Sequence, residues 1–503
     1  MTITIEDIAI FCKKKGFVYP SSEIYGGIGG FWDFGPLGVE LYNNIKDHWW
    51  KYFVQDKDNM IGMDSSIISH PRIWKASGHL DCFGDLVLTC SRCKERLRAD
   101  LFVEESIGLK VEGMDTDLVN KIIKKNKLVC PRCKAKFEPL KAFNLLFKTY
   151  VGAQEDKASI AYLRGETAQG MFTDFKLIAD TTRQKLPFGI AQIGKCFRNE
   201  IAPRDFMFRS REFTIAEFEF FIHPDEKKCN QLTKKHLNLK VDLLDAETQE
   251  KGKQTLKHVT IGKMIKDKRL GEWHAYWLAE QMMWFYSLGL TNLKIREHTN
   301  TELSHYSSAT FDIDYAYPFG SKEIAGNANR GQYDLKQHIH ETKEKLELYD
   351  EETKKKIIPK VIEPTFGIER VFLAVLVEAY NDDKKRGNIV LKLKPELAPI
   401  KIAVFPLVNK LDKKAKTVYN ILKTEFNSFY DTSGSVGRRY ARQDELGTPL
   451  CCTIDFQSLE DDTVTLRDRN TTKQIRVKIN DLIPKIYAFL KGEKLTSLGK
   501  PIQ

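Results

Sequence analysis

The sequence lacks any feature that would place the chain in or across a membrane. No stretch of the 503 residues approaches the roughly 18 uninterrupted apolar residues that a membrane-spanning helix needs. The opening segment, MTITIEDIAIFCKKKG, carries its lysines after a short apolar run rather than before it, which is not the order of a secretory signal. We therefore expect a cytoplasmic protein with no membrane partner.

Internal repeats and low-complexity tracts rich in Gly, Ser or Pro are also missing, which excludes repeat and fibrous architectures. A chain of this length is too long for one hydrophobic core and is expected to fold as about three domains. The charged, turn-rich stretch NDDKKRGN and the Pro-flanked apolar run after it predict a domain boundary near residue 390. The residues that follow alternate strand and helix patterns, which is typical of a small α/β module.

A disulfide framework is not expected, because most of the ten cysteines show no regular spacing. Four of them form two CxxC pairs, Cys90/Cys93 and Cys130/Cys133. Two such pairs supply the four thiolates that tetrahedral zinc takes in a structural site, with no position left open for catalysis. The alternative is a pair of hairpins that kept their cysteines without binding metal.

The chain lacks an acidic excess: 79 Lys and Arg residues outnumber 68 Asp and Glu residues, and the formal net charge is +11. A basic balance is compatible with a polyanionic partner, nucleic acid above all, and equally with a lysine-rich surface that binds nothing.

The most informative stretch is GIAQIGKCFRNEIAPRDFMFRSREFTIAEFEFF, residues 189–221. Its ends alternate like strands around a turn-rich middle, which predicts an antiparallel hairpin with a long loop. Arg198 and Glu200 would share one strand face, as would Phe213, Ile215, Glu217 and Glu219 on the return strand. Arginine suits phosphate because its planar fork donates two parallel hydrogen bonds. The alternative is a solvated charged face.

A second stretch, VIEPTFGIERVFLAVLVEAY, residues 361–380, predicts an apolar strand that ends at Pro364, a glycine turn and an apolar helix. Arg370 falls in the first helical turn, where the macrodipole disfavours a cation. An anion held jointly by Arg370 and the helix end would explain this placement. In isolation, an arginine reaching to the surface explains it equally well.

These two stretches resemble motifs 2 and 3 of class II aminoacyl-tRNA synthetases, and the whole chain resembles the homodimeric glycyl-tRNA synthetases. The resemblance rests on an ordered set of motifs: YLRGETAQG, FRNEIAPR, EFEFF, ANRGQYDLKQH and VIEPTFG. It implies an α+β fold in which helices flank an antiparallel class II sheet, with a small Cys-rich insertion and a C-terminal α/β anticodon-binding domain. It also implies a homodimer that uses ATP with Mg²⁺, glycine and tRNA(Gly).

The resemblance implies a role for each matching position. Arg198, Glu200 and Arg370 would be catalytic: Arg198 would hold the α-phosphate, Glu200 would accept from the adenine amine, and Arg370 would clamp the terminal phosphates. The other ATP-binding positions would be Asn199, Phe208, Arg211, Phe213, Glu323, Ile324 and Gly367. The glycine site would use Arg98, Glu166, Phe213, Glu217, Glu363, Thr365 and Gly367. Because glycine has no side chain, selectivity must come from its ammonium group and from exclusion of larger amino acids.

Some positions depart from the family pattern. Thr365 stands where serine is usual, Gly165 where proline usually precedes the glutamate, Asn327 where an apolar residue is expected, and Ser321-Lys322 where Trp-Gly is usual. None of these departures removes a catalytic group.

The same resemblance divides the chain into segments. The catalytic domain would comprise residues 1–85 with motif 1 and the dimer contacts, 146–222 with motif 2, and 291–390 with motif 3. A Cys-rich zinc insertion would span 86–145, a basic helical insertion 223–290, and the anticodon-binding domain 395–503. In that last domain Arg438, Arg439 and Arg442 would meet unpaired anticodon bases or backbone.

Two rival interpretations follow from the sequence. A synthetase-like paralogue that binds RNA or protein without catalysis should have lost Arg198, Glu200, Glu363 or Arg370, and all of them are present. A class II synthetase for another small amino acid is disfavoured by the acid set Glu166, Glu217 and Glu363 within glycyl-type motifs.

Overall fold

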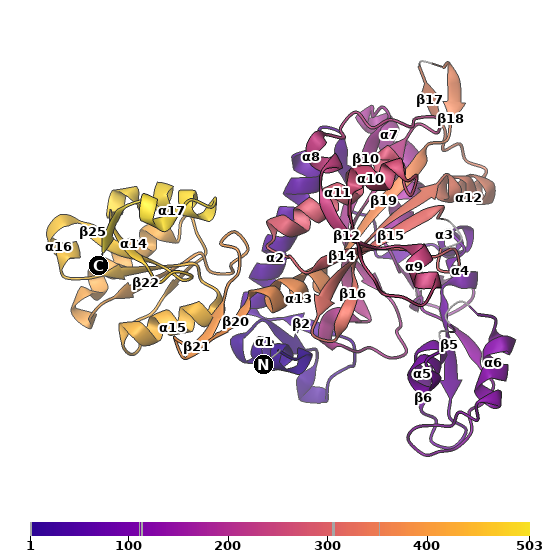
Figure 1. The fold of residues 1–503 in the computed structure, drawn as a ribbon, viewed down its shortest axis with the longest axis horizontal. Helices are drawn as coiled ribbons and strands as arrows, with labels where there is room; N and C mark the ends of the chain where they lie inside the picture. Colours follow the sequence, from indigo (N-terminus) through magenta and orange to yellow (C-terminus); the bar gives the residue numbers. More distant parts are fainter. Residues whose placement is uncertain (1–2, 110, 112–113, 304–306, 352, 503) are drawn as a thin grey trace.

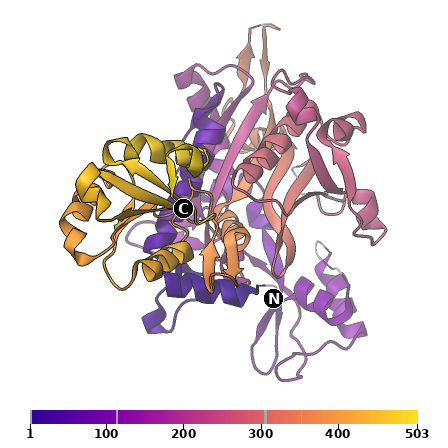
Figure 2. The same cartoon turned by 60° about the vertical axis from the view of Figure 1, so that its left-hand side comes forward.

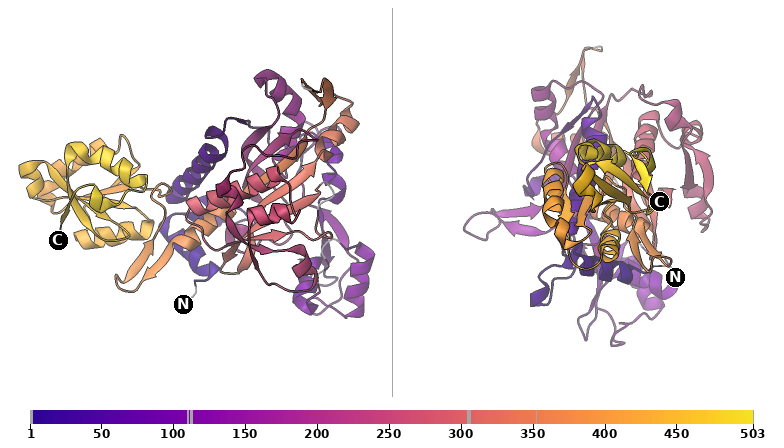
Figure 3. Two further views of the ribbon diagram at one scale, coloured as in Figure 1. Left: turned by 45° about the horizontal axis from the view of Figure 1, so that its top comes forward. Right: turned by 90° about the vertical axis from the view of Figure 1, so that its left-hand side faces the viewer.

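The computed structural model describes residues 3–109, 111, 114–303, 307–351 and 353–502. It combines helices and sheets in a main body from which two smaller parts project (Figure 1). The C-terminal module lies at one end of the molecule and the Cys-rich insertion at another, as Figures 1 and 3 both show. Within the described part of the chain, no helix is long and apolar enough to cross a membrane.

The main body is built on a nine-stranded sheet with the order β13-β12-β14-β15-β16-β19-β11-β10-β3. Its pairs are antiparallel except β3 with β10 and β12 with β14. The strands are β3 (Met60–Gly62), β10 (Phe188–Phe197), β11 (Glu212–Ile222), β12 (Lys240–Leu244), β13 (Lys257–Thr260), β14 (Leu293–Glu297), β15 (Ala309–Tyr317), β16 (Gly320–Gly331) and β19 (Lys360–Gly367). Segment 223–290, expected to be helical, therefore also adds β12 and β13 to the edge of this sheet.

Helices pack on the sheet, and the largest hydrophobic core lies between them. The helix α11 (Glu272–Ser287) is buried on nearly all sides, as expected for a helix that is apolar all round. The other helices of the main body are α1 (Ile5–Lys15), α2 (Pro36–Trp50), α3 (Pro71–Ala76), α4 (His79–Cys82), α7 (Ala168–Thr182), α8 (Lys234–Leu237), α9 (Ala246–Glu250), α10 (Ile261–Lys266), α12 (Tyr333–Thr342) and α13 (Ile368–Ala379).

Short strands complete the main body at its surface. The strands β4 (Ile68–Ser69), β8 (Lys148–Tyr150) and β9 (Ile160–Leu163) form a three-stranded sheet. Three two-stranded ribbons are β1 (Val18–Pro20) with β2 (Trp32–Phe34), β17 (Leu348–Asp350) with β18 (Lys355–Ile357), and β20 (Tyr380–Asp383) with β21 (Asn388–Leu391).

The hairpin expected for residues 189–221 is present: β10 and β11 pair antiparallel from Phe188↔Phe221 to Phe197↔Glu212. The prediction that Arg198 and Glu200 share a strand face is wrong, because β10 ends at Phe197 and both residues lie in the loop. The backbone N–H of Arg198 donates to the carbonyl of Arg211 at 2.9 Å, so the two loop ends remain joined.

The strand expected to end at Pro364 continues to Gly367. Proline removes one ladder donor, and a central strand normally excludes it. Here Pro364 pairs with Asn327 on β16, whereas the ladder between β19 and β11 has no pair at Pro364. The missing N–H is therefore tolerated, and α13 begins directly after the strand at Ile368.

The Cys-rich insertion has its own small sheet and core. Its elements are β5 (Gly84–Thr89), β6 (Arg96–Arg98), α5 (Ala99–Ile107), α6 (Thr116–Lys125) and β7 (Lys141–Asn144). Leu88, Val103 and Val119 are among the residues of a core separate from that of the main body.

The C-terminal module is an α/β domain with a second separate core, which runs from Ile402 to Leu495. Its sheet has the order β23-β22-β24-β25-β26-β27. The elements are β22 (Ile402–Pro406), α14 (Asp412–Leu422), β23 (Ser428–Tyr430), α15 (Val436–Leu446), β24 (Leu450–Ile454), α16 (Gln457–Asp461), β25 (Thr463–Asp468), β26 (Gln474–Lys478), α17 (Leu482–Leu490) and β27 (Lys500–Ile502). It lies beside the β20–β21 ribbon (Figure 2), where Arg386 bonds to Asp444 and to the carbonyl of Arg469.

Candidate active site

Three of the acids expected to bind an ammonium group converge on one face of the sheet. Glu217 on β11, Glu363 on β19 and Glu166 just before α7 are all buried. The Thr365 hydroxyl donates to Glu217 at 2.7 Å and lies 3.3 Å from Glu363. The Thr167 hydroxyl also donates to Glu217. The residue that stands where serine is usual therefore joins two of the acids through its hydroxyl.

Two basic side chains that sequence reasoning missed contact these acids. Arg330, at the end of β16, donates to Glu363 at 2.8 Å and forms a bidentate ion pair with Asp334 on α12. His79 Nε2 lies 3.1 Å from Glu166. Arg330 lies within the motif ANRGQYDLKQH, which could have singled it out, whereas His79 belongs to no motif that we recognised.

Burial and these partners set the protonation of the acids. Burial alone raises the pKa of Glu166, but the charges of His79 and Arg330 outweigh it and bring the pKa below its usual range. Burial raises the pKa of Glu363 well above its usual range, and the charges of Glu217 and Glu166 add to the effect. Neighbouring carboxyls in one pocket thus differ in their tendency to ionise.

A polar cleft of about 320 Å³ opens beside this cluster. Glu166, Arg164 and Trp74 are among the residues that line it. Of the three acids, only Glu166 lines this cleft, so the cleft reaches the cluster at one edge.

Arg198 lies next to the acid cluster. Its Nε donates to the carbonyl of Gly165 at 3.1 Å, one residue before Glu166. Its guanidinium lies 5.3 Å from the ring centre of Phe213 and 5.1 Å from that of Phe83. Gly165 packs closely there, since an added Cβ would lie 2.9 Å from Leu146. The departure at position 165 thus coincides with a tight turn that presents its carbonyl to Arg198.

The loop after Arg198 holds Glu200 in a fixed position. Glu200 is buried, and its carboxylate accepts from Arg209 Nε at 2.7 Å. Arg211 donates to the backbone carbonyl of Glu200 at 3.0 Å and to that of Gly29 at 2.6 Å. The backbone N–H of Asn199 donates to Leu145. Through Arg211, Gly29 is thereby joined to this loop.

Arg370 lies in the first turn of α13. It pairs with the Glu323 carboxylate at 3.2 Å and lies 4.6 Å from the ring centre of Phe208. Gly367, which ends β19, packs against it, because an added Cβ would lie 3.1 Å from Arg370 Cδ. Ile324 is fully buried in the main core, so its side chain is unavailable to a ligand.

Arg98 lies on the Cys-rich insertion, at the end of β6. It pairs with Asp85 at 3.1 Å and with Asp100. Asp85 also lies 3.8 Å from Arg209, the partner of Glu200. These ion pairs connect Arg98 to the Glu200 side of the site rather than to Glu217 and Glu363.

Asn327, another departure from the family pattern, lies on the opposite side of the sheet from the acids. It is fully buried, and its amide donates to Gln281 on α11 at 2.7 Å. Its backbone carbonyl accepts from His274 at 3.1 Å. The amide N–H of Asn327 is therefore satisfied by α11, whereas its buried Oδ1 has no hydrogen-bond partner among the described residues.

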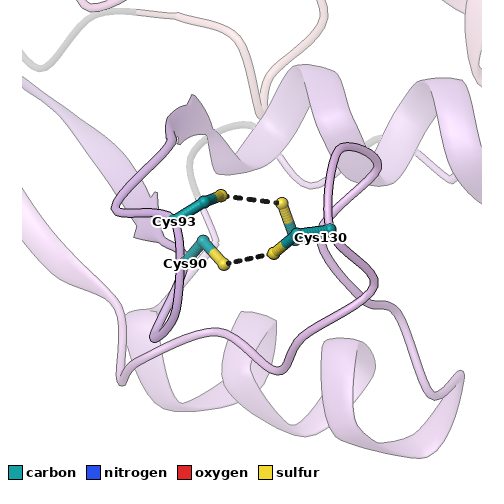
Figure 4. A group of neighbouring side chains, drawn as sticks. Cys90, Cys93 and Cys130 are labelled. Atoms are coloured by element: carbon teal, nitrogen blue, oxygen red, sulfur yellow. Dashed lines mark hydrogen bonds between the residues drawn. The ribbon is translucent and has the colours of Figure 1, made fainter.

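The four paired cysteines form one cluster within the insertion (Figure 4). Cys90 Sγ lies 3.4 Å from Cys133 Sγ, and Cys93 Sγ lies 3.6 Å from Cys130 Sγ. Sulfurs bound tetrahedrally at the usual zinc–sulfur length lie about 3.8 Å apart. Because all four sulfurs lie within 4.8 Å of one another, the thiolates fit a zinc ion.

The arginines expected to meet RNA differ in availability. Arg439 is buried and donates to the carbonyls of Pro406 and Asp431, so its expected role in RNA contact is not supported. Arg442 pairs with Asp431 at 3.1 Å while about half of its side chain stays exposed, 45%. Arg438 lies exposed in the first turn of α15.

Comparison with known proteins agrees with the family resemblance of the sequence motifs. The anticodon binding domain family matches residues 401–488. A glycine–tRNA ligase of Caldanaerobacter subterraneus subsp. tengcongensis is 44% identical over 490 residues, which cover 95% of this chain and 97% of that protein. A glycine–tRNA ligase of Clostridium beijerinckii is 43% identical and covers 97% of this chain and 99% of its own length. The chain belongs to the glycine–tRNA ligase family.

Proposed function

We propose that this protein joins glycine to tRNA(Gly) at the expense of ATP, through a glycyl-adenylate intermediate, as a class II homodimer in the cytoplasm. The observation that carries the proposal is that the buried acids and Arg198 are neighbours. Arg198 donates to the carbonyl of Gly165, the residue before the buried Glu166, and Arg370 stands in the first turn of α13. Activation of an amino acid needs an ammonium-binding site beside a phosphate-binding arginine, because the amino acid's carboxylate must attack the α-phosphate.

The acids account for recognition of glycine. Glu166, Glu217 and Glu363 would accept hydrogen bonds from the ammonium group, and Thr365 would fix the two acids that it joins. The residues packed around them would leave no room for a side chain, so larger amino acids are excluded by overlap.

The arginines account for activation of ATP. Arg198 would hold the α-phosphate and stabilise the charge that develops as the carboxylate attacks, because a preorganised donor acts most strongly where charge builds up. Glu200 would accept from the adenine amine and Phe213 would stack on the ring. Arg370 would clamp the terminal phosphates once Glu323, its present partner, turns to the Mg²⁺ that accompanies ATP.

The C-terminal module would bind the anticodon, since its family match covers most of that module. Arg438 and Arg442 follow the carboxyl end of β23, where parallel α/β sheets commonly bind ligands. They are the exposed cations that unpaired bases or phosphates would meet.

Zinc would hold the insertion together through Cys90, Cys93, Cys130 and Cys133. Elemental analysis of protein purified without chelator should find about one zinc per chain. Metal-free protein with an intact, reduced insertion would contradict this assignment.

The dimer would form through α2 and the segment around β4. The exposed apolar side chains Val39, Ile67 and Ile68 support this surface. Sedimentation should give a dimer at micromolar concentration, and a fully active monomer would contradict the proposal.

The decisive experiment separates the two halves of the reaction. The full chain should exchange pyrophosphate into ATP with glycine, and with no other amino acid of a panel. Arg198→Ala should lower this exchange at least 100-fold, or about 3 kcal/mol, while tRNA affinity stays nearly unchanged. Removal of residues 395–503 should leave exchange largely intact and strongly reduce tRNA charging. A folded truncated chain that charges tRNA normally would overturn this division.

A further inference from the structure

One buried acid beside the proposed glycine site has no assigned role. Glu219 follows Glu217 by two residues on β11, so both carboxyls lie on the same face. Glu219 is completely buried, at 0% exposure, and neither of its oxygens has a hydrogen-bond partner among the described residues. An unpaired buried carboxyl is costly, and such a group in a native structure calls for an explanation.

The geometry around Glu219 fits a primary ammonium group. One carboxylate oxygen from each of Glu217, Glu219 and Glu363 lies within 4.8 Å of the other two. The centre of an equilateral triangle with that side lies about 2.8 Å from each corner, a normal N–H···O distance. An ammonium nitrogen has three donors, one for each acid.

The charges around Glu219 do not allow every acid to be ionised in the empty site. Glu219 and Glu363 lie between the β11–β19 pairs Glu217↔Thr365 and Phe220↔Ile362, and their carboxylate oxygens lie within 4.8 Å of each other, where like charges repel. Glu217 on β11, Glu166 before α7 and Asp334 on α12 add negative charge. The cations facing the cluster are Arg330 from β16 and, when protonated, His79 from α4 and His338 from α12.

Burial raises the pKa of Glu219 well above its usual range, and the charge of Glu363 raises it further. A carboxyl in this position keeps its proton until a cation arrives. The glycine ammonium is such a cation, and it would replace the proton as the partner of the Glu219 oxygens.

We propose that Glu219 is a third acceptor for the glycine ammonium, and that its carboxyl, protonated in the empty site, releases its proton to solvent as glycine binds. This inference rests on the proposed glycine site. The O–H bond of Glu219 breaks, the proton passes to the buffer, and the carboxylate accepts an N–H of the ammonium. Glycine affinity should therefore rise with pH, by up to tenfold per unit while Glu219 titrates.

The test is titration calorimetry of the full-length protein with glycine, in phosphate and in Tris at the same pH. The difference in heat between the two buffers gives the number of protons released. The unchanged protein should release close to one proton per glycine. Glu219→Gln, which keeps the shape but has no acidic proton, should release none and bind glycine about tenfold more weakly. Its affinity should no longer depend on pH, and kcat for exchange should change far less than KM.

A matched control is Glu369→Gln on α13. Glu369 is also buried, and one of its oxygens has no hydrogen-bond partner in the described part of the chain. Its other oxygen accepts from the Thr214 N–H at 2.7 Å, outside the acid cluster. This variant should keep the parental proton release and affinity for glycine.

The outcomes separate the two proposals. If the parental protein binds no glycine, the proposed function fails. If it binds glycine with no proton release and with the same affinity from pH 6 to pH 8.5, the inference about Glu219 fails while the proposed function stands. Equal proton release by Glu219→Gln and the parent would also overturn it. The pH series needs only the parental protein, so it decides the question even if the glutamine variant does not fold.

Discussion

The two faces of strand β11 have opposite chemistry although both are buried. One face presents Glu217 and Glu219, neither of which is more than 1% exposed. The other presents Phe218 and Phe220, whose ring centres lie 4.6 and 4.9 Å from that of Trp277 on α11. Successive residues of a strand point to opposite sides, so eleven residues carry both the buried acids and part of the main core.

The comparison shows how the sheet tolerates its acids. Burying several carboxyls with few cations destabilises the folded state, and such ion pairs seldom stabilise it in return. The aromatic face buries large apolar surfaces directly behind them, and burial of that kind is the main favourable contribution to folding. We infer that stability resides mainly on the α11 face and substrate recognition on the other, which predicts that mutations on the two faces have separable effects.

The largest effect is expected for Trp277→Ala, on the aromatic face. Trp277 is fully buried, and its removal should lower the free energy of unfolding of the main body by about 3–5 kcal/mol. Urea denaturation, followed through loss of exchange activity, measures this change. In the fraction that remains folded, KM for glycine should stay within about twofold of the parental value. A large change in KM at unchanged stability would show that the two faces are not separable.

The sequence predicts the faces of β11 better than the partners of its acids. Alternation alone places Glu217 and Glu219 on one side, and α11 lies within the segment 223–290 expected to be helical. In contrast, the ion pairs of Arg330 with Glu363 and of His79 with Glu166 join residues far apart in the chain. Which cation neutralises which acid depends on tertiary packing, and local patterns carry no information about it.

Two errors have the same physical origin. Proline usually ends a central strand, but β19 continues through Pro364 because the ladder to β11 has no pair at that residue. Arginine usually reaches solvent, but Arg439 is buried because the carbonyls of Pro406 and Asp431 accept its hydrogen bonds. Both residues depart from the usual local preference of their residue type, because tertiary partners override it.

The second prediction concerns pH and again tests the α11 face. His274 on α11 donates from Nε2 to the Asn327 carbonyl, whereas its buried Nδ1 has no partner in the described ranges. Burial lowers the pKa of His274 to about 4, because a second proton would lack an acceptor. The unfolded chain binds that proton near pH 6.5, so stability is present above pH 6.5 and is lost as pH falls toward 4.

The expected loss from His274 is about 3 kcal/mol over that interval. His274→Gln can keep the donor to Asn327 and cannot be protonated, so its stability should fall less between pH 7 and pH 4.5 than that of the parent. Urea midpoints at both pH values measure the difference. His340→Gln is a suitable control, because His340 is exposed on α12, away from the core that holds His274, and its replacement should leave the difference between the two midpoints nearly unchanged. Parallel curves for His274→Gln and the parent would contradict the prediction.

The smallest effect is expected on the acid face, at Thr365. Thr365→Ser keeps the hydroxyl that donates to Glu217 and removes only a methyl group, so glycine activation should change by less than ~1.5 kcal/mol. The extra space should allow slight activation of alanine, which the parent should not activate. Thr365→Val makes the opposite change, since it keeps the shape and removes the donor. Its cost should be larger, about 1–3 kcal/mol, because a buried carboxylate then loses a partner.

Pyrophosphate exchange with glycine and with alanine measures both Thr365 variants. If the hydroxyl matters more than the methyl, serine at this position will resemble the parent and valine will not. Complete loss of activity in Thr365→Ser would mean that the methyl group, and not the hydroxyl, holds the acids in place. The acid face would then depend on packing as strongly as the aromatic face does, and the contrast between the two faces would fail at the residue that joins Glu217 to Glu363.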